Sequence, residues 1–296
     1  MTNGENQRLI YSPRPFLKWA GGKRALLEEI RNRTPEYAGK YIEPFLGAGA
    51  VLFDQDFYRK KVVSDFNSDL IEVYETIRDK PNELLAALRK HKNSKEHYYE
   101  VRAWDREKTY YSRKTKVQRA ARFIFLNKTN YNGLYRVNAA GQMNVPFGTQ
   151  ANPDWIQKDL ILSVSTFLNA RADSGEFLNT FMSGDYKEAL KIAKPGDWVY
   201  LDPPYADTFT HYQSGGFSDQ QQAELRNEIL RLTELKIPVL LSNSNAPIIR
   251  ELYSDKSMFN IELVTVRRAI GSASESRVKT QEVLINNYKK IGAAVG

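Results

Sequence analysis

The sequence contains no cysteine among its 296 residues. That absence excludes disulfide bonds, thiolate metal ligands and cysteine nucleophiles. Histidine is also scarce, with three residues in the chain, so we expect no metal site built from histidines. Long apolar runs are missing as well, because none approaches the ~20 residues that a membrane-spanning helix needs. We therefore expect neither a metal ion nor a membrane to take part in the function.

The beginning of the chain lacks the apolar core of a secretory signal, since residues 1–14 are polar. We therefore expect a cytoplasmic protein. The composition is 42% hydrophobic, enough for a substantial core. The formal net charge of +8 favours a polyanionic partner such as nucleic acid. A solvated basic surface is the alternative interpretation of that charge.

A carboxylate, two prolines and an aromatic ring follow an apolar segment at 198–201, which predicts a short buried strand. The Asp202 carboxylate and the Pro203 carbonyl are hydrogen-bond acceptors, and Pro204 restricts the preceding proline to extended geometry. Tyr205 offers a flat face for stacking. Two acceptors and a ring fit the exocyclic amino group of a nucleobase. The alternative is a Pro-Pro turn after a core strand, because short motifs also match by accident.

Two glycine-containing turns occur in the first fifty residues. The Gly-Gly-Lys turn at 21–23 precedes a helical pattern at 25–30, which suits either an anion site or a surface turn. The spacing of a P-loop is missing. A short strand at 40–43 then leads into a Phe-x-Gly-x-Gly turn at 45–49 and a helix expected to reach about residue 57. Strand, glycine turn and helix open a Rossmann-like unit, in which the backbone approaches a nucleoside-type cofactor.

An acidic residue follows the next expected strand, at 61–64. Asp65 stands where Rossmann-like folds hydrogen-bond the ribose hydroxyls of a cofactor. A helix cap is the alternative, since a helical pattern follows, although Asn67 or Ser68 could also cap that helix. The third glycine of a nicotinamide fingerprint is missing after Gly47 and Gly49, which favours a cofactor without a pyrophosphate.

Basic and aromatic residues concentrate between about residue 69 and residue 156. Helical patterns recur there at 81–92, 94–107 and 115–127. The last of these carries a cation at every third position, namely Lys116, Arg119 and Arg122. Such a face either binds phosphates or is simply solvated.

A hairpin is expected after these helices. Asn132-Gly133 is a turn signal, and residues 134–138 and 142–146 predict two strands joined by Ala139-Ala140-Gly141. Asparagine, tyrosine and arginine side chains on such a hairpin suit insertion into a DNA groove and the readout of guanine. An ordinary hairpin loop is the alternative.

Strands and helices alternate in the remainder of the chain. A strand at 177–182 ends in Gly184-Asp185, and a helix follows at 186–193. Further helices are expected at 219–235 and 247–253, and further strands at 238–241, 259–266 and 282–288. This order predicts an α/β fold with a mostly parallel, doubly wound sheet, and leaves antiparallel pairing open for the last strands.

The motifs now stand in a particular order: FLKWAGGK at 16–23, EPFLGAG at 43–49, the basic insertion at 69–156, and DPPY at 202–205. This order resembles the Dam-type DNA adenine-N6 methyltransferases of the D12 class, in the arrangement with the cofactor motif first. Other segments are similar to the same family, namely NYNGLYRVN at 130–138, NVPFG at 144–148, SNSN at 242–245 and VRRAI at 266–270. The resemblance therefore covers nearly the whole chain.

The resemblance implies a Rossmann-like methyltransferase sheet with an inserted, mostly helical target-recognition domain that carries a β-hairpin. Residues 1–68 and 157–296 would form the catalytic domain that binds S-adenosylmethionine, and 69–156 the recognition domain. The implied reaction is methyl transfer to N6 of adenine in double-stranded DNA, within GATC, by base flipping and direct displacement. The protein would be prokaryotic and associated with the nucleoid. The missing cysteine agrees, because cytosine ring-carbon methylation needs a thiolate.

Site residues also follow from the resemblance. The candidate cofactor site comprises Trp19, Lys23, Glu43, Phe45, Gly47, Gly49, Asp65, Asp185 and Asp202. The candidate catalytic pocket comprises Asp202, Pro203, Pro204 and Tyr205. The candidate DNA contacts are Lys18 to the outer guanine, Tyr131 by intercalation, Asn132 to phosphate, and Leu134, Arg136 and Pro146 to base edges, with Lys116 and Arg119 on the basic helix. The segment 206–216 is shorter than is usual in the family, so it receives no assignment.

Three alternatives remain at this point. The methyl acceptor could be N4 of cytosine or an adenine in RNA, since the amino groups have similar geometry. The chain could be a DNA-binding protein that keeps a methyltransferase fold without activity. A nicotinamide oxidoreductase is disfavoured by the incomplete glycine fingerprint. Three biological settings stay open for such an enzyme: a restriction–modification system, genome maintenance or a phage.

Overall fold

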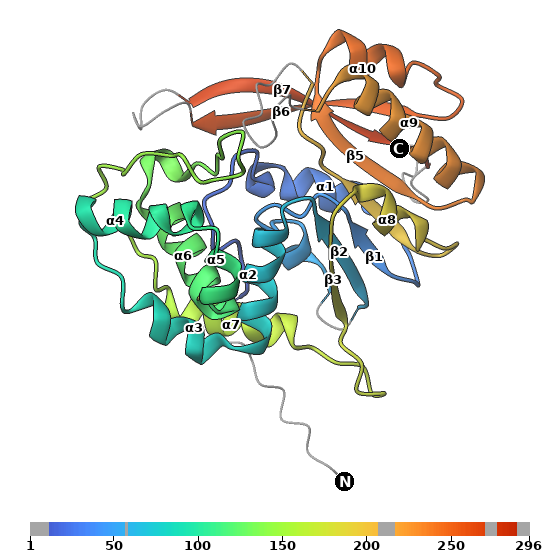
Figure 1. The fold of residues 1–296 in the computed structure, drawn as a ribbon. Coiled ribbons are helices and arrows are strands. Elements are labelled where there is room, and N and C mark those ends of the chain that lie inside the picture. Colours follow the sequence, from blue (N-terminus) through green and yellow to red (C-terminus); the bar gives the residue numbers. More distant parts are fainter. Residues whose placement is uncertain (1–11, 57–58, 207–216, 270–276, 289–296) are drawn as a thin grey trace.

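The computed structural model describes residues 12–56, 59–206, 217–269 and 277–288. Its strands form one sheet in the order β3-β2-β1-β4-β5-β7-β6 (Figure 1). In chain order the strands are β1 (Tyr41–Glu43), β2 (Lys61–Asp65), β3 (Asn179–Ser183), β4 (Trp198–Leu201), β5 (Val239–Ser244), β6 (Asn260–Ala269) and β7 (Arg277–Asn286).

The first five strands of the sheet are parallel, and the last two are not. β1 pairs in parallel with both β2 and β4, while β3 extends the sheet beyond β2 and β5 extends it beyond β4. β7 pairs antiparallel with both β5 and β6. The predicted α/β fold with a mostly parallel, doubly wound sheet is therefore confirmed, and the open question of the last strands is settled as antiparallel.

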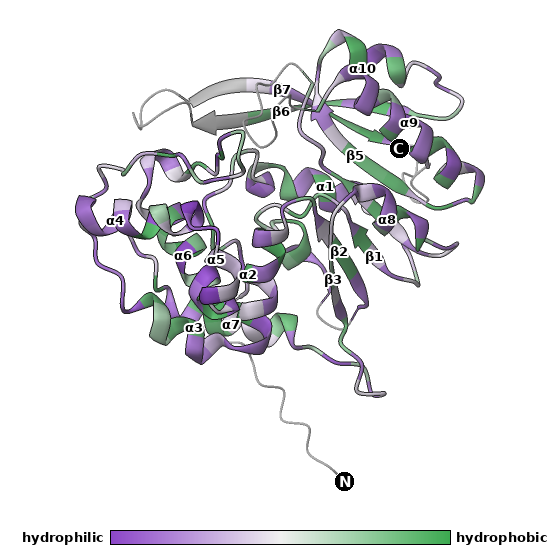
Figure 2. Ribbon diagram, viewed as in Figure 1, coloured by the Kyte–Doolittle hydropathy of each residue, from purple (hydrophilic) through white to green (hydrophobic). Residues whose placement is uncertain are grey.

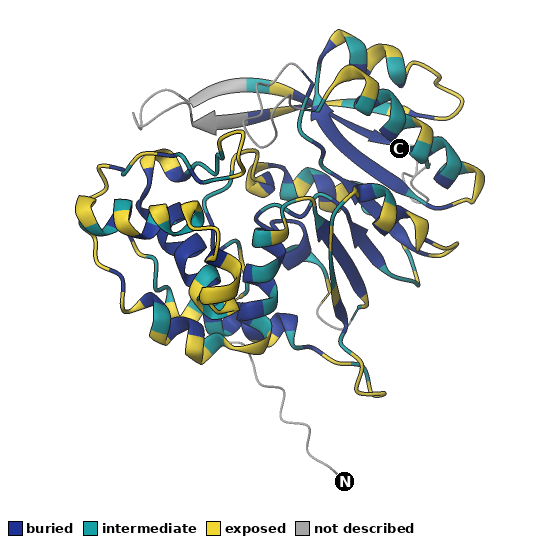
Figure 3. Cartoon of the chain, in the orientation of Figure 1, coloured by how far each residue is buried: buried dark blue, intermediate teal, exposed yellow. Residues whose placement is uncertain are grey.

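Both faces of the sheet are covered, which explains why its central strands are apolar throughout. Successive side chains of a strand point to opposite faces, so Tyr41 and Trp198 join one core cluster while Ile42 and Val199 join the other. The first cluster is closed by α1 (Leu27–Arg33), α2 (Ser68–Asp79) and α7 (Lys158–Leu168). The second is closed by α8 (Tyr186–Lys191), α9 (Asp219–Glu234) and α10 (Pro247–Leu252). Figure 3 shows the buried strands between these helix layers.

A helical lobe lies beside the sheet (Figure 1). It contains α3 (Pro81–Leu88), α4 (Lys95–Arg102), α5 (Tyr110–Arg113) and α6 (Lys116–Thr129). Its own small core is formed by Tyr98, Val101, Phe125, Leu126, Met143 and Val145. Figure 2 shows hydrophobic residues along the strands and hydrophilic ones on outward-facing helices such as α9. The helices expected at 81–92, 94–107 and 115–127 are all present, the second broken into α4 and the 3-10 helix η3 (Ala103–Arg106).

One expected helix is wrong. After the glycine turn at 45–49 the chain forms only the 3-10 helix η2 (Leu52–Asp54) instead of a helix reaching about residue 57. Its hydrogen bonds join Asp54 N to Val51 O and Gln55 N to Leu52 O, and Gln55 is already extended. The turn therefore leads directly back toward β2.

The expected hairpin exists in a reduced form. One isolated antiparallel bridge joins Val137 and Met143, and the Asn138 N–H donates to Gln142 O at 2.9 Å. Gly141 closes the turn with a φ of +74°. The two five-residue strands expected at 134–138 and 142–146 do not form, because the chain there makes side-chain contacts with the helical lobe in place of a longer ladder. The residues before it form the 3-10 helix η4 (Tyr131–Gly133).

Within the described ranges, no helix is both long and apolar enough to cross a bilayer. Among the same residues, no group of three or more acidic, histidine or cysteine side chains is arranged to hold a metal ion. The segment 206–216, apart from Ala206, lies outside the described residues.

Candidate active site

Several strand ends meet along one edge of the parallel part of the sheet. β4 ends immediately before Asp202, β1 ends at Glu43, and β2 ends at Asp65. The parallel register places all three carboxylates at the carboxyl edge. The strand order reverses between β1 and β4, since the chain first builds outward to β3 and later outward to β5. Ligands of open α/β sheets bind at such a reversal point.

Asp202 lies within a small polar cluster. Lys23 Nζ is 2.8 Å from Asp202 Oδ2, and the Ser242 hydroxyl donates to Oδ1 at 2.8 Å. Burial raises the pKa of Asp202 above its usual value, and the contacts with Lys23 and Ser242 oppose that rise. A carboxylate has about four lone-pair sites, so these two contacts leave acceptor capacity. Asp202 is therefore fixed in orientation and still able to accept further hydrogen bonds.

The Gly-Gly-Lys turn brings Lys23 into this cluster. Gly21 has a φ of +78°, and the 3-10 helix η1 (Lys23–Leu26) begins directly after the turn. The lysine is buried, with 5% of its surface exposed, and its Nζ lies 4.7 Å from the centroid of the Tyr205 ring. The alternative of a surface turn with a solvated lysine is therefore wrong.

The residues after Asp202 are anchored by side chains from β5, α9 and β7. The Pro204 carbonyl accepts from Gln222 Nε2 at 3.0 Å, and the Tyr205 hydroxyl donates to Glu282 Oε2 at 2.5 Å. Among the hydrogen bonds between described residues, none uses the Pro203 carbonyl. The geometry therefore combines a held carboxylate, a carbonyl acceptor and a half-buried aromatic ring.

Residue-level reasoning from the sequence missed these supporting side chains. Asn243 accepts from the Ala206 N–H at 3.2 Å and donates to Gln222 Oε1 at 3.1 Å. Ser242 and Asn243 belong to the SNSN segment, which the sequence analysis likens to the family without assigning a role to its residues. The sequence offers one indication for Glu282, because an acidic residue directly before the apolar run Val283 to Ile285 is unusual for a buried strand.

The glycine turn forms a wall beside this cluster. Gly47 and Gly49 have φ values of +50° and +70°, and a Cβ at Gly47 would lie 2.9 Å from Trp19 Cδ1. The Trp19 ring in turn stacks on Tyr135, with centroids 5.5 Å apart. Glycine is therefore required for both conformation and contact, and Trp19 lies directly against the turn.

Asp65 holds the turn from the adjacent strand. Its Oδ2 accepts from the Gly47 N–H and its Oδ1 from the Asn67 N–H, both at 2.9 Å. Burial raises the pKa of Asp65, and the two backbone donors oppose the rise. The cap of α2 is Asn67, which accepts from the Leu70 N–H, so Asp65 does not serve as the cap. Phe66, next to it, exposes 66% of its surface and was missed from the sequence.

The other candidate cofactor residues differ in accessibility. Glu43 is 2% exposed, accepts from the Tyr41 hydroxyl at 2.8 Å, and has a pKa raised well above the usual value because of burial. Asp185 is exposed and caps α8 through the Lys187 N–H. Phe45 stacks on Tyr186, with centroids 5.2 Å apart. Glu43 is therefore buried and bonded to Tyr41, whereas Asp185 is exposed at the start of α8.

The N-terminal motif is joined to the segment predicted to read DNA. Asn127 accepts from the Lys18 N–H at 2.9 Å, and its Nδ2 donates to both Lys18 O and Gly133 O. A Cβ at Gly133 would lie 2.3 Å from Lys18 Cβ. Burial lowers the pKa of Lys18, whose Nζ donates to Gln150 Oε1 at 2.7 Å. Lys18 is therefore packed directly against the segment that is predicted to read DNA.

The other predicted DNA contacts lie along this segment. Tyr131 is 49% exposed, and its N–H donates to the carbonyl of the exposed Pro146 at 3.0 Å. Asn132 is exposed and has a φ of +56°. Arg136 Nε donates to Asn144 Oδ1 at 2.7 Å, which holds the guanidinium, while Leu134 is half-buried against the lobe.

The expected basic face on α6 is wrong for two of its three cations. Arg119 forms an ion pair with Glu72 and also donates to Lys114 O, with 12% of its side chain exposed. Arg122 is buried and pairs with Asp105. Both guanidinium groups are used inside the lobe, because helix α6 packs that side against its neighbours. Lys116, with 66% of its side chain exposed, faces solvent.

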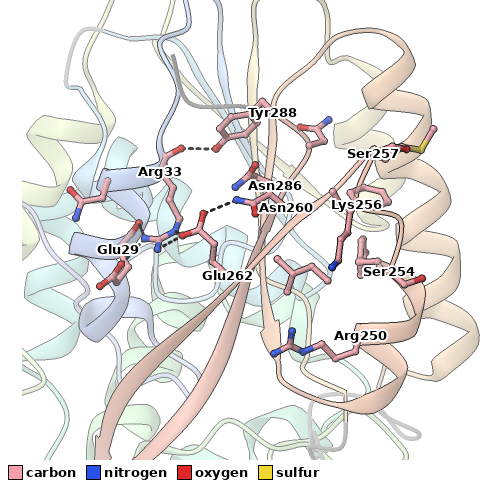
Figure 4. Close-up of a pocket in the computed structure, with 16 residues that line it drawn as sticks. Glu29, Arg33, Arg250, Ser254, Lys256, Ser257, Asn260, Glu262, Asn286 and Tyr288 are labelled. Carbon is pink, nitrogen blue, oxygen red and sulfur yellow. Dashed lines mark hydrogen bonds and ion pairs between the residues drawn. The ribbon is translucent and has the colours of Figure 1, made fainter. Parts of the chain in front are cut away.

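A separate cavity of about 1090 Å³ lies at the opposite edge of the sheet (Figure 4). Asn260 and Asn286, which face each other across β6 and β7, line it. Figure 4 shows Arg33 between Glu29 and Glu262, both of which it pairs with. None of the predicted site residues lines this cavity, so its volume has no part in the site described above.

Fold and site together define a Rossmann-like protein whose ligand site combines a glycine turn with an Asp-Pro-Pro-Tyr end on β4. The model of one family, described as D12 class N6 adenine-specific DNA methyltransferase, matches residues 19–270. The chain therefore belongs to the D12 class of N6 adenine-specific DNA methyltransferases. The resemblance found in the sequence and the expected enzyme class are both confirmed.

Curated relatives agree with this membership. The chain is 41% identical over 282 residues to the Type II methyltransferase M1.LlaDCHI of Lactococcus lactis subsp. cremoris, covering 93% of this chain and 95% of the relative. It is 35% identical over 280 residues to the DNA adenine methylase of Escherichia coli, covering 92% and 94%. It is 36% identical over 301 residues to the Type II methyltransferase M.MjaIII of Methanocaldococcus jannaschii, covering 93% and 99%.

Proposed function

We propose that this enzyme transfers a methyl group from S-adenosylmethionine to N6 of adenine within GATC in double-stranded DNA, after flipping the base. The observation that carries the proposal is the end of β4. There the Asp202 carboxylate is held by Lys23 and Ser242, next to the Pro203 carbonyl and the Tyr205 ring. Two acceptors and a ring match the amino group and the face of an adenine.

The adenine amino nitrogen is a poor nucleophile, because its lone pair is delocalised into the ring. Asp202 and the Pro203 carbonyl accept its two hydrogens, which draws the nitrogen toward tetrahedral geometry and frees the lone pair. Positioning and electrostatics then supply most of the rate enhancement. Asp202 is the stronger acceptor when ionised, so its ionised form is the active one. Extruding the base costs a few kcal/mol, and stacking on Tyr205 recovers about 1–3 kcal/mol.

The glycine turn fits S-adenosylmethionine, which when bound supplies the sulfonium methyl group. A Cβ at Gly47 would collide with Trp19, so the turn leaves a bare backbone beside an indole. Asp65, held by two backbone N–H groups, provides a fixed acceptor for ribose hydroxyls. The exposed Phe66 ring provides an apolar surface for the adenine of the cofactor. Lys23 and Asp202 would line the cofactor site where it meets the catalytic pocket.

We propose the division of labour expected from the sequence: residues 1–68 and 157–296 for catalysis and 69–156 for recognition. The GATC assignment rests on the segment 130–148. Its exposed Tyr131 and Asn132 suit intercalation and phosphate contact, and its oriented Arg136 suits a guanine. Leu134, Pro146 and Lys18 complete the base-reading set, and Lys116 contacts phosphate. Arg119 is omitted because its guanidinium pairs with Glu72 and only 12% of its side chain is exposed. Such an enzyme works on chromosomal DNA in the cytoplasm of a prokaryote.

The site preference is tested by digestion of DNA from cells that express the protein. Nucleases that cut GATC only when its adenine is methylated, and others blocked by that methyl group, should give opposite patterns. Unchanged patterns with both nucleases would contradict the GATC assignment. Transfer of labelled methyl groups to separate DNA and RNA polymers decides between DNA adenine and the alternative acceptors, cytosine N4 and RNA adenine.

Loss of the Asp65 carboxylate should weaken cofactor binding. Hydrogen bonds to a charged group contribute about 1.5–3 kcal/mol, so the KM for S-adenosylmethionine in Asp65→Ala should rise about 10- to 100-fold. The DNA affinity should change little. Steady-state kinetics with the two substrates varied separately measure this.

Asn67→Ala is the matched control for Asp65. It removes the cap of α2 and should lower the free energy of unfolding by about 1 kcal/mol with an unchanged KM. If Asp65→Ala instead lost thermal stability and kept its cofactor KM, the carboxylate would be a structural support of the turn only.

Removing the Ser242 hydroxyl should shift the acid limb of the pH profile of kcat/KM to higher pH. Burial raises the pKa of Asp202, and the hydrogen bond from Ser242 lowers it. Without that bond the pKa rises further, so the active, ionised form is lost at a higher pH as the solution is acidified. The acid limb of kcat/KM, which reports the free enzyme, should therefore shift to higher pH in Ser242→Ala.

Ser244→Ala is the control, because Ser244 also lies on β5 but donates to Ala206 O and does not contact Asp202. Its acid limb should stay in place. Coinciding acid limbs for the Ser242 variant and the parent enzyme would mean that a different group controls the acid side.

A further inference from the structure

Glu282 is a carboxylate buried on β7, the strand between β5 and the edge strand β6. It lies on β7, opposite Ser244 of β5 and Val264 of β6, and exposes 3% of its surface. The residues that follow it on the strand, Val283 to Ile285, are apolar and equally buried. An apolar residue at this position would continue the pattern of the strand, so packing alone does not explain a carboxylate here.

The hydrogen bond to Tyr205 links this carboxylate to the end of β4. The Tyr205 hydroxyl donates to Glu282 Oε2 at 2.5 Å, a separation typical of a hydroxyl bonded to a charged acceptor. Lys23 Nζ lies over the same ring, 4.7 Å from its centroid. The ring is thus held at its hydroxyl by β7 and on one face by the N-terminal motif. Its orientation is fixed from two directions.

Placing a carboxylate here has an electrostatic cost. Burial is the main cause of the raised pKa of Asp202, and the negative charge of Glu282 adds to that rise, so it works against the ionised form of Asp202. Replacing a buried charge by an apolar residue of similar size is often neutral or stabilising. A buried carboxylate that also opposes the ionisation of its neighbour suggests a functional role, and its bond to Tyr205 indicates which one.

We propose that Glu282 is a positioning residue for methyl transfer, which acts by orienting the Tyr205 ring on which the flipped adenine stacks. The inference rests on the proposed function, because it assigns the ring to the target base. A ring fixed before the base arrives holds the amino group toward Asp202 and the Pro203 carbonyl. A ring free to tilt would leave the base in the pocket but misaligned, so the loss should appear in kcat and not in substrate binding.

The test compares Glu282→Leu, Glu282→Gln, Tyr205→Phe and the double variant Glu282→Leu/Tyr205→Phe in the full-length enzyme. Methyl transfer to a GATC duplex gives kcat and both KM values, and thermal unfolding gives Tm. The matched control is Glu262→Leu, the same substitution on neighbouring β6, where the carboxylate pairs with Arg33 at the opposite edge.

We expect kcat to fall about 10- to 100-fold in Glu282→Leu, with both KM values within about twofold of the parent enzyme and an equal or higher Tm. Glu282→Gln keeps an acceptor and should lose less. The fall in kcat should be as large in Tyr205→Phe as in Glu282→Leu. The double variant should show no larger fall than either single variant, because each substitution breaks the same hydrogen bond. The control should keep the parental kcat.

Three results would overturn the inference: an unchanged kcat in Glu282→Leu, losses that multiply in the double variant, or a loss of kcat matched by a fall in Tm. If Glu282→Leu did not fold, an unchanged kcat in Tyr205→Phe would still refute it. Failure of the proposed function is distinguishable, since the parent enzyme would then transfer no methyl group to the duplex.

Discussion

Replacing Asp202 with alanine should reduce kcat about 10²- to 10³-fold, the usual cost of removing one preorganised hydrogen-bonding group that acts on the transition state. The residue lies at the carboxyl end of β4, and its orientation is set by Lys23 and Ser242. Without it, only the Pro203 carbonyl accepts from the adenine amino group. Single-turnover methylation of a GATC duplex measures this step directly.

Specific DNA binding should survive in Asp202→Ala, because the recognition segment 130–148 is held by Asn127 and not by the β4 end. The variant also leaves Lys23 without its carboxylate, so thermal stability must be recorded and the kinetics measured well below the Tm. Near-normal turnover in a folded Asp202→Ala protein would contradict the assignment of the catalytic pocket.

Replacing Arg136 with alanine should change sequence preference more than DNA affinity. Asn144 fixes the guanidinium, since its Oδ1 accepts from Nε at 2.7 Å and its carbonyl accepts from Nη2 at 3.5 Å. The remaining hydrogens of Nη1 and Nη2 can donate to O6 and N7 of a guanine. A good bidentate pair discriminates by about 1–3 kcal/mol, or about 5- to 150-fold in kcat/KM. The kcat/KM for methylation of GATC should fall by that factor in Arg136→Ala. The kcat/KM for sites altered at the contacted guanine should change little. The measurement is kcat/KM on GATC and on its singly substituted variants.

Lys116→Ala is the matched comparison, since this lysine is exposed on α6 and lies 3.5 Å from Glu75. A phosphate contact carries no sequence information, so its loss should weaken all sites alike and lower the salt slope by about one contact. Measurements at two salt concentrations separate the two behaviours. A uniform loss across all sites in Arg136→Ala would mean that this residue holds the backbone and that another one reads the base.

The arrangement of the sheet could be predicted because its signals are local. Short apolar runs bounded by turns located all of its parallel strands, and Asp65 and Asp202 were predicted at the ends of two of them. The glycine turn was found for the same reason, since Gly47 and Gly49 adopt positive φ values that favour glycine. Sequence spacing therefore indicated the frame of the site.

The contacts that complete the site could not be predicted in the same way. Ser242 and Glu282 are 40 and 77 residues from their partners Asp202 and Tyr205, so no local pattern connects them. The pairing of Arg119 was not predicted, because periodicity gives the helix face but not the neighbour that covers it, here Glu72. Such contacts depend on long-range packing, which a single sequence does not encode locally.

The most direct test of the account is the chemical identity of the methylated base. Duplex DNA with one GATC site is incubated with the purified enzyme and S-adenosylmethionine carrying a deuterated methyl group, and its nucleosides are then separated by mass. The account predicts labelled N6-methyladenine from the GATC adenine alone, at a rate reduced about 10²- to 10³-fold in Asp202→Ala. Labelled methyl groups on cytosine, or on adenines outside GATC, would contradict the account. An unchanged rate of labelling by Asp202→Ala would contradict it as well.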